Sequence, residues 1–138
     1  MTTPTIPGQD RLAILLRALL VFDSSIFLVA GLLHLGVHVA GVAEPPIADA
    51  ATVEFIAGLA LAVAAAAVVA RAWWAWYTAV AAQALAAAGV SLGMAALAFG
   101  LGPTTMLNFV YHRVMLVLLI AGLAVVILPA GRRALGKR

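Results

Sequence analysis

The feature that most constrains the fold is a series of four long apolar runs. A membrane-spanning helix needs about 20 mostly apolar residues to cross about 30 Å of hydrocarbon. The predicted spans cover residues 12–42, 52–70, 73–99 and 110–128. Because lipid offers no hydrogen-bond partner to the backbone, such runs are expected to be helical. The sequence therefore predicts an all-α integral membrane protein, a single domain over residues 1–138, built as an up-down-up-down four-helix bundle.

Composition agrees with lipid as the solvent of this chain. Apolar residues make up 66% of the sequence and charged residues only 9%, whereas a soluble domain carries about 25% charged residues. The absence of cysteine excludes disulfides, thiolate nucleophiles and iron–sulfur clusters. The eight Lys and Arg residues form no basic helix, so nucleic acid is not an expected partner. The N-terminal stretch also lacks the signature of a cleaved signal peptide.

The distribution of basic residues predicts the orientation of the spans. With the N-terminus inside the cell, seven Lys and Arg residues lie on the cytoplasmic side and one lies outside. Such an excess is the usual mark of the cytoplasmic side. The expectation is a bacterial inner-membrane protein with both termini in the cytoplasm. The inside set is Arg11, Arg17, Arg71, Arg132, Arg133, Lys137 and Arg138, and the outside residue is Arg113.

The histidines and one glutamate converge on the outer leaflet in this arrangement. The stretch GLLHLGVHVAGVAEPP places His34 and His38 near the outer end of the first span. Glu54 and His112 fall in the first turns of the second and fourth spans, which begin on the same side. Ionisable side chains within a span face the bundle interior. These four side chains are therefore predicted to face one another.

Two kinds of site are open for this cluster. His34 and His38, four residues apart on one helix face, together with Glu54 and His112, could ligate one transition metal such as Zn, Cu, Fe or Mn. A single haem b is a variant, in which His112 and either His34 or His38 serve as axial ligands. The alternative is a polar cluster that holds no metal and is joined by hydrogen bonds.

A second buried polar group is predicted at Asp23, deeper in the first span and on the same face as its histidines. An unpaired carboxylate at this depth is unfavourable by a few kcal/mol. Asp23 is therefore expected to be protonated, to pair with Arg17, or to bond to Ser24, Ser25 or Gln83. Gln83 lies near mid-bilayer in the third span and is likewise expected to be buried.

Arg113 is the third residue of this buried polar set. As the one basic residue assigned to the outer side, it could form a simple ion pair with Glu54. Such a pair would hold the second and fourth spans together at the outer interface.

Small residues line one side of the third span. Ala82, Ala86, Gly89, Gly93 and Ala96 follow a spacing of four, three, four and three residues, and GVSLG is a G-x-x-x-G motif. Motifs of this kind let helix backbones approach closely in membranes. The third span is therefore expected to pack tightly against its neighbours.

Two stretches resemble known membrane proteins. LLRALLVFDSSIFLVAGLLHL, followed by VEFIAGLALAVAAAAVVAR, resembles the small four-span bacterial proteins of the DoxX-like group, through Arg17 early in the first span and through Gly31 and His34 at its end. GVSLGMAALAFGLGPTTMLNFVYHRVML resembles a stretch of uncharacterised small actinobacterial and proteobacterial membrane proteins. The DoxX-like resemblance implies an accessory subunit of a membrane oxidoreductase that handles quinone or redox stress.

The leading functional prediction is a small polytopic membrane protein of the binding or accessory class. No nucleophile grouping, H-E-x-x-H motif or phosphate loop is present, so an enzyme is not favoured. One alternative is a haem- or metal-bearing, quinone-linked redox subunit. Another is an oligomeric small transporter or proton-linked carrier, suggested by Asp23 and Gln83. Expected partners are the lipid bilayer and either a larger membrane complex or further copies of this chain.

Overall fold

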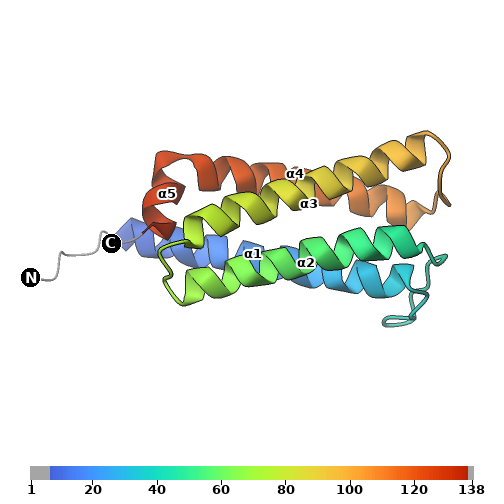
Figure 1. Cartoon of the computed structure of the whole chain (residues 1–138), viewed down its shortest axis with the longest axis horizontal. Coiled ribbons are helices and arrows are strands. Elements are labelled where there is room, and N and C mark those ends of the chain that lie inside the picture. Colours follow the sequence, from blue (N-terminus) through green and yellow to red (C-terminus); the bar gives the residue numbers. More distant parts are fainter. Residues whose placement is uncertain (1–6, 137–138) are drawn as a thin grey trace, which may run out of the picture.

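The computed structural model describes residues 7–136, with side chains described from Arg11 onward. Within this part of the chain the structure has five helices and no strand, which confirms the all-helical prediction (Figure 1). The helices are α1 (Pro7–His34), α2 (Ala48–Val69), α3 (Ala75–Ala98), α4 (Met106–Ile127) and α5 (Pro129–Leu135).

Four of these helices are long and apolar enough to cross a membrane. The candidate spans contain 22 to 24 residues each and are Arg11–His34, Ala48–Val69, Ala75–Ala98 and Met106–Ile127. At about 1.5 Å per residue, each reaches about 33 Å or more, which matches the hydrocarbon thickness of a bilayer. The chain is therefore a small polytopic membrane protein, as its four apolar runs predict.

The first helix ends earlier than predicted. It stops at His34 rather than at Val42, because Gly36 adopts a left-handed conformation with φ +83°. The N–H of Val37 then donates to the carbonyl of Leu32 at 3.0 Å, which is the closing bond of a Schellman C-cap. Residues beyond this cap cannot share a helix face with those before it. The prediction that the first span continues through residue 42 is wrong on this point.

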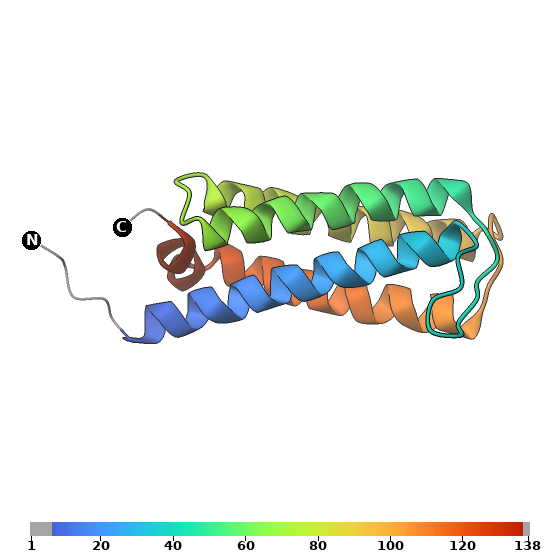
Figure 2. The same cartoon turned by 90° about the horizontal axis from the view of Figure 1, so that it is seen from below.

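The long helices lie side by side around a common interior. α1 packs along α2, α2 along α3 and α3 along α4, whereas α1 and α4 touch at few positions. The α1–α2 and α3–α4 loops lie at one end of the molecule, and the α2–α3 link lies at the other (Figures 1 and 2). The ring of four helices is thus least tightly closed between its first and last members.

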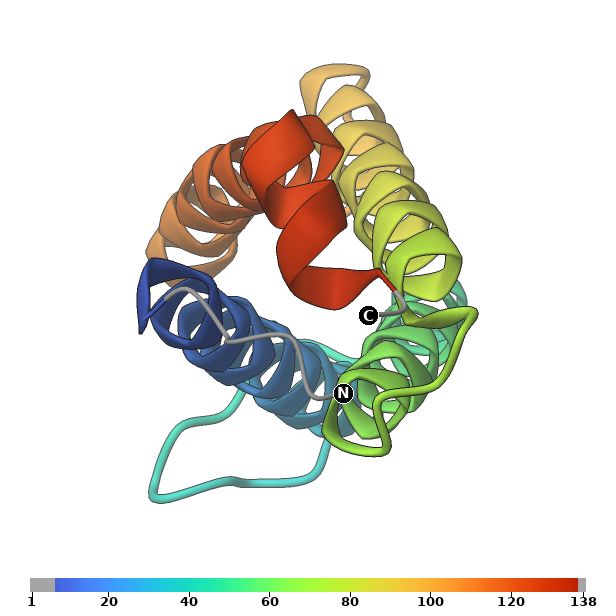
Figure 3. The ribbon, with the colours of Figure 1, turned by 90° about the vertical axis from the view of Figure 1, so that its left-hand side faces the viewer.

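A short fifth helix, which the four apolar runs of the sequence do not predict, closes one end of the bundle. Pro129 occupies the first turn of α5. The N–H groups of a first turn have no partner within the helix, so the missing N–H of proline removes no intrahelical hydrogen bond there. The helix lies across the end of the ring formed by the long helices (Figure 3). Gly131 and Leu135 are buried there, and Arg132 stacks over the ring of Trp76 at 5.0 Å. α5 therefore covers the end of the apolar core.

The core is built from a few large side chains and many small ones. Its largest fully buried apolar residues are Phe27, Leu20, Leu61, Leu119 and Val126. Alanines of α2 and α3 fill the remaining space between helices. Small residues allow close helix approach in lipid, where the hydrophobic effect does not drive helix association. The small residues of α3 allow such a close approach at Gly93, where an added Cβ would overlap the ring of His112.

Candidate functional site

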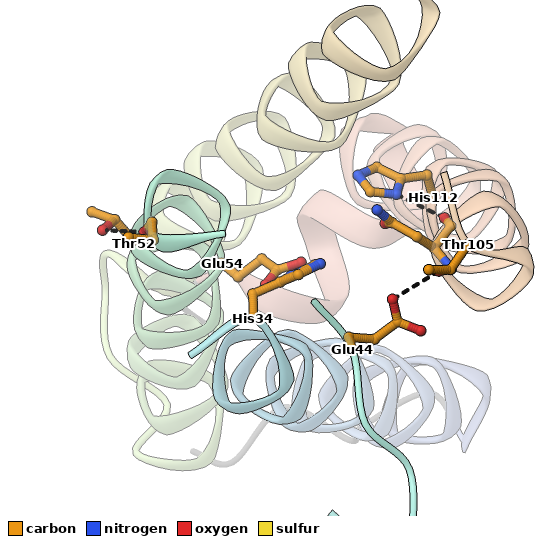
Figure 4. A network of polar contacts seen from close by, with 8 residues as sticks. His34, Glu44, Thr52, Glu54, Thr105 and His112 are labelled. Atoms are coloured by element: carbon orange, nitrogen blue, oxygen red, sulfur yellow. Dashed lines mark hydrogen bonds and ion pairs between the residues drawn. The ribbon is translucent and has the colours of Figure 1, made fainter. Parts of the chain in front are cut away.

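The centre of the site is a buried hydrogen-bonded pair between α1 and α2. Nδ1 of His34 lies 2.7 Å from Oε2 of Glu54, and the two residues are 4% and 5% exposed. His34 is the last residue of α1, and Glu54 stands near the start of α2, so the α1–α2 loop brings these helix ends together. Both side chains point toward the bundle interior (Figure 4). The pair links two helices inside an apolar bundle.

The other ring nitrogen of His34 has no partner. Nε2 is buried and makes no hydrogen bond in the structure. Since a carboxylate only accepts, the ring donates to Glu54 through Nδ1–H. In the neutral ring, Nε2 then presents a lone pair. Buried polar atoms nearly always have a partner, so this atom is an exception within the bundle.

The start of α4 adds three further polar side chains to the same end of the bundle. His112 is buried, and its Nδ1 lies 2.9 Å from the backbone carbonyl of Asn108. Tyr111 stacks edge-on against Phe27 of α1, with ring centroids 6.3 Å apart, and its hydroxyl lies near the Glu54 carboxylate. The hydroxyl of Tyr111 and Oδ1 of Asn108 are both buried without a hydrogen-bond partner.

A hydrogen bond ties the two loops at this end together. The hydroxyl of Thr105 donates to Oε2 of Glu44 at 2.7 Å. The same hydroxyl accepts from the backbone N–H of Asn108 at 3.1 Å and thereby caps α4 (Figure 4). The N–H of Ile47 donates to the carbonyl of His34 at 2.8 Å, which fixes the return of the chain into α2. These bonds hold the histidine-bearing helix ends in place.

An apolar groove between α1 and α4 leads to this polar end. Its volume is about 310 Å³, near the lower end of the range for small-molecule sites. The walls are apolar along most of their length, and the polar residues His34, Glu44, Asn108 and Tyr111 belong to its lining at one end. The groove follows from the sparse contact between α1 and α4.

A second groove lies against the other side of the same cluster, between α2 and α3. It has a volume of about 330 Å³, and Glu54, Tyr111 and His112 are among its lining residues. Gly89 and Gly93 form part of its α3 wall. Tyr111 lines both grooves and so separates them. The polar cluster therefore lies between the two grooves; polar surface is accessible in the second groove, whereas the surface of the first is apolar.

The structure does not assemble the predicted four-ligand metal site. His38 lies beyond the end of α1, in the loop, and is exposed. In the part of the chain with described side chains, no group of three His, Asp or Glu residues is close enough to hold a metal ion. The cause is the C-cap at Gly36, which removes His38 from the helix face of His34. His34, Glu54 and His112 do lie inward at the same end of the bundle.

Arg113 does not occupy the buried position expected for it. Its side chain is exposed, lies 3.3 Å above the centre of the Phe109 ring and donates to the Phe109 carbonyl at 3.1 Å. Glu54 is instead engaged by His34. The ion pair between Glu54 and Arg113 is therefore not formed, because adjacent residues of a helix point about 100° apart and His112 takes the inward position.

Asp23 and Gln83 form a separate polar pair deeper in the bundle. Both residues are 0% exposed, and Nε2 of Gln83 donates to Oδ2 of Asp23 at 3.2 Å. Of the alternatives expected for Asp23, the structure shows the bond to Gln83. Ser24 bonds instead to the Gly58 carbonyl at 2.8 Å, which joins α1 to α2. Oδ1 of Asp23 and Oε1 of Gln83 make no hydrogen bond.

The site residues predicted from the sequence do not include Glu44, Asn108 or Tyr111, although Asn108 and Tyr111 are predicted to lie near His112. Asn108 and His112 stand four residues apart, a spacing that places them on one helix face, and this was the available signal. Glu44 lies in a loop with no periodic pattern, so its contact with Thr105 could not be predicted. No protein-family model matches the chain, and neither the curated proteins nor the solved structures include a match to it.

Proposed function

We propose that this chain is a binding or accessory protein of a bacterial inner membrane, and that the α1/α4 groove holds one lipid-dissolved molecule. The apolar part of this molecule lies between α1 and α4, against the apolar walls of the groove. The role is binding rather than catalysis. The accessory role that the DoxX-like resemblance implies stays a prediction.

The observation that carries this proposal is an apolar groove of about 310 Å³ between α1 and α4. The surface that the groove presents is apolar throughout, although His34, Asn108 and Tyr111 belong to its lining at one end. Small-molecule sites in proteins are lined mostly by apolar side chains. The groove therefore offers its contacts to an apolar molecule or to the apolar part of a larger one.

The position of the groove supports entry from the bilayer. Its α1 wall runs from Phe22 to His34, about 18 Å at 1.5 Å per residue. This length is close to one leaflet, about half of a 30 Å hydrocarbon core. Val29 and Val114 line the groove and are also exposed. A molecule dissolved in the membrane would reach the site sideways, without crossing a loop.

The charges at the two ends support an up-down-up-down arrangement with both termini in the cytoplasm. Exposed arginines mark the end that holds the α2–α3 link, the start of α1 and α5. The other end carries Glu44, Asp49 and one arginine, Arg113. By the positive-inside rule the first end is cytoplasmic. The His34–Glu54 pair then belongs to the extracytoplasmic leaflet.

A pair of tryptophan substitutions on α4 tests the proposed function. Val114→Trp fills the groove, whereas Val117→Trp adds the same bulk at an exposed position outside both grooves. Native mass spectrometry of protein purified from its membrane in mild detergent gives the readout. The wild type and Val117→Trp are expected to carry a bound small molecule that Val114→Trp has lost. Equal occupancy in the two variants, or no bound molecule in the wild type, would overturn the proposal.

A further inference from the structure

We infer that the α2/α3 groove is a second binding site, and that it takes a small organic ammonium ion whose N–H groups donate to Glu54 and His112. This site is separate from the α1/α4 groove and does not depend on the proposed function. The inference follows from three features of the α2/α3 groove: its accessible polar surface, an unpartnered histidine nitrogen aimed into it, and the sign of its charges.

The α2/α3 groove has accessible polar surface, which the α1/α4 groove lacks. The polar side chains of its lining are those of Asp49, Glu54, Tyr111 and His112. The hydroxyl of Tyr111 is fully buried. Oε1 of Glu54 and Nε2 of His112 make no hydrogen bond within the described residues, yet neither is one of the fully buried atoms without a partner. Both atoms therefore keep accessible surface.

The ring of His112 is aimed into the groove at Gly93. A Cβ added at Gly93, which also lines the groove, would overlap Nε2 of His112. Nδ1 of the ring donates to the Asn108 carbonyl, because a carbonyl only accepts, so Nε2 of the neutral ring presents a lone pair. The side chain is only 7% exposed. An acceptor so nearly buried seldom lacks a partner, and an N–H donor that enters the groove would satisfy it.

Glu54 provides a second acceptor in the same groove. His34 occupies its Oε2, which leaves Oε1 for a ligand. Tyr111 adjoins both acceptors, since its ring centroid lies 5.1 Å from that of His112 and its hydroxyl lies near the Glu54 carboxylate. Glu54 and His112 point toward the bundle interior from α2 and α4 (Figure 4). A ligand head at this depth therefore meets two acceptors.

The charges of the groove favour a cation. Asp49 is exposed in the first turn of α2 and lies five residues before Glu54, which is about 8 Å at 1.5 Å per residue. No Lys or Arg is among the described lining residues. Arg113, next to His112 in the sequence, is stacked on Phe109, which does not line the groove. A cation that enters from the loop end thus meets one carboxylate at the mouth and another deeper in, without a competing basic side chain.

An organic ammonium ion suits this groove better than a metal ion. In the described part of the chain, no three His, Asp or Glu side chains are close enough to hold a metal. Much of the wall is apolar and includes Val53, Val90 and Leu92. The volume of about 330 Å³ lies within the range of small-molecule sites. An ammonium group on an apolar body uses both kinds of surface, through charge-assisted hydrogen bonds and through apolar contact.

Four probes that share a benzyl group test this inference in the full-length protein. They are benzylammonium, benzyl alcohol, benzyltrimethylammonium and phenylacetate, compared by titration calorimetry in mild detergent. Benzylammonium is expected to bind about tenfold more tightly than the alcohol, which lacks the charge, and than the trimethylammonium ion, which lacks N–H groups. A charge-assisted hydrogen bond accounts for about that factor. Phenylacetate is expected not to bind.

Two variants locate the binding in the groove. Val53→Trp fills the α2/α3 groove and is expected to abolish binding of benzylammonium. Ile56→Trp adds the same bulk at an exposed position of α2 outside both grooves and is expected to retain it. His112→Phe keeps a ring but removes the acceptor, and is expected to weaken benzylammonium binding about tenfold.

A charge variant at the surface leaves the core intact. Asp49→Asn is expected to weaken benzylammonium binding about threefold and to leave benzyl alcohol unchanged, as expected for one exposed ion pair. Glu44→Gln removes a carboxylate at the same end of the bundle but outside this groove, and is the matched control.

The inference would be overturned by no measurable binding of benzylammonium, by equal affinity for benzylammonium and benzyl alcohol, by tighter binding of phenylacetate, or by binding that Val53→Trp leaves unchanged. One Zn²⁺ bound per chain in the wild type and none in Val53→Trp would assign the groove to a metal ion instead. None of these results bears on the α1/α4 groove, which Val114→Trp tests separately.

Discussion

At the scale of single residues, the main feature of the molecule is that buried polar side chains pair with one another inside an apolar bundle. His34 and Glu54 satisfy each other at 2.7 Å, and Gln83 satisfies one oxygen of Asp23 at 3.2 Å. A buried pair of this kind adds little net stability over an apolar pair, yet removal of one partner is strongly destabilising. Each pair therefore matters mainly because its two members hydrogen-bond to each other. Substitution of either member is expected to destabilise the bundle by leaving the other buried without a partner.

The His34–Glu54 pair is expected to be essential to stability at the loop end. Glu54→Leu leaves His34 buried without a partner and is expected to lower the free energy of unfolding by about 3 kcal/mol. Glu54→Gln keeps an acceptor for Nδ1–H and is expected to lower it by about half as much. Asp49→Leu, which removes an exposed carboxylate from the first turn of the same helix, is expected to change it by less than about 1 kcal/mol.

Unfolding in detergent, followed by the helical circular-dichroism signal, gives these free energies. If Glu54→Leu and Asp49→Leu were equally stable, the buried pair would have no structural importance and the polar cluster would not be organised by it.

At the scale of helices, their existence was predictable and some of their ends were not. Each long apolar run became a helix because lipid leaves the backbone no other partner. The end of α1 was mispredicted because the stretch around Gly36 is apolar on both sides. Only the left-handed backbone at that glycine shows where the helix stops. The longer helix predicted from the sequence also places His38 one turn above His34, whereas in the structure His38 lies in the loop beyond α1.

Part of the candidate site could be predicted from the positions of the spans alone. Glu54 and His112 stand close to helix starts, so their depth follows from the spans alone, and the structure places both inward. Whether Arg113 can reach Glu54 depends on which of the adjacent residues His112 and Arg113 faces inward. A one-residue difference turns a helix face by about 100°, which is beyond what an almost uniformly apolar span can specify.

The packing of α3 against α4 depends on a missing side chain. At Gly93 an added Cβ would overlap the His112 ring, so Gly93→Ala is expected to displace that ring and to destabilise the bundle by about 1–3 kcal/mol, as overpacking usually does. Ala95→Ser adds one heavy atom at an exposed position of the same helix and serves as the matched control. Thermal unfolding compares the two. A Gly93→Ala protein as stable as Ala95→Ser would show that His112 does not pack against α3.

At the scale of the whole molecule, four helices form a ring that is closed tightly on three sides. The loose contact between α1 and α4 opens a groove, and α5 covers the end opposite the polar cluster (Figure 3). The apolar outer surface faces lipid, and exposed arginines concentrate at the α5 end. One end of the bundle is thus basic and is covered by α5. The other end holds the polar cluster, next to the α1–α2 and α3–α4 loops.

The proposed orientation predicts which loops water-soluble reagents reach from outside the cell. Because the chain has no cysteine, single cysteines report on one position each. Ala43→Cys in the α1–α2 loop is expected to react with a membrane-impermeant maleimide in intact cells. Ala70→Cys in the α2–α3 link is expected to react only after the membrane is opened. The reverse pattern would place the polar cluster on the cytoplasmic side.

The most direct test of ligand binding is photolabelling with a long-chain alcohol that carries a diazirine in its chain, followed by mass-spectrometric mapping of the labelled residues. Binding in the groove predicts labels on Val29 and Leu33 of α1 and on Val110 and Val114 of α4, and their loss in the presence of excess unlabelled alcohol. Labels spread over all lipid-facing residues, including Ile56 and Leu59 of α2, and unchanged by that competitor, would contradict the proposal that the groove is a binding site.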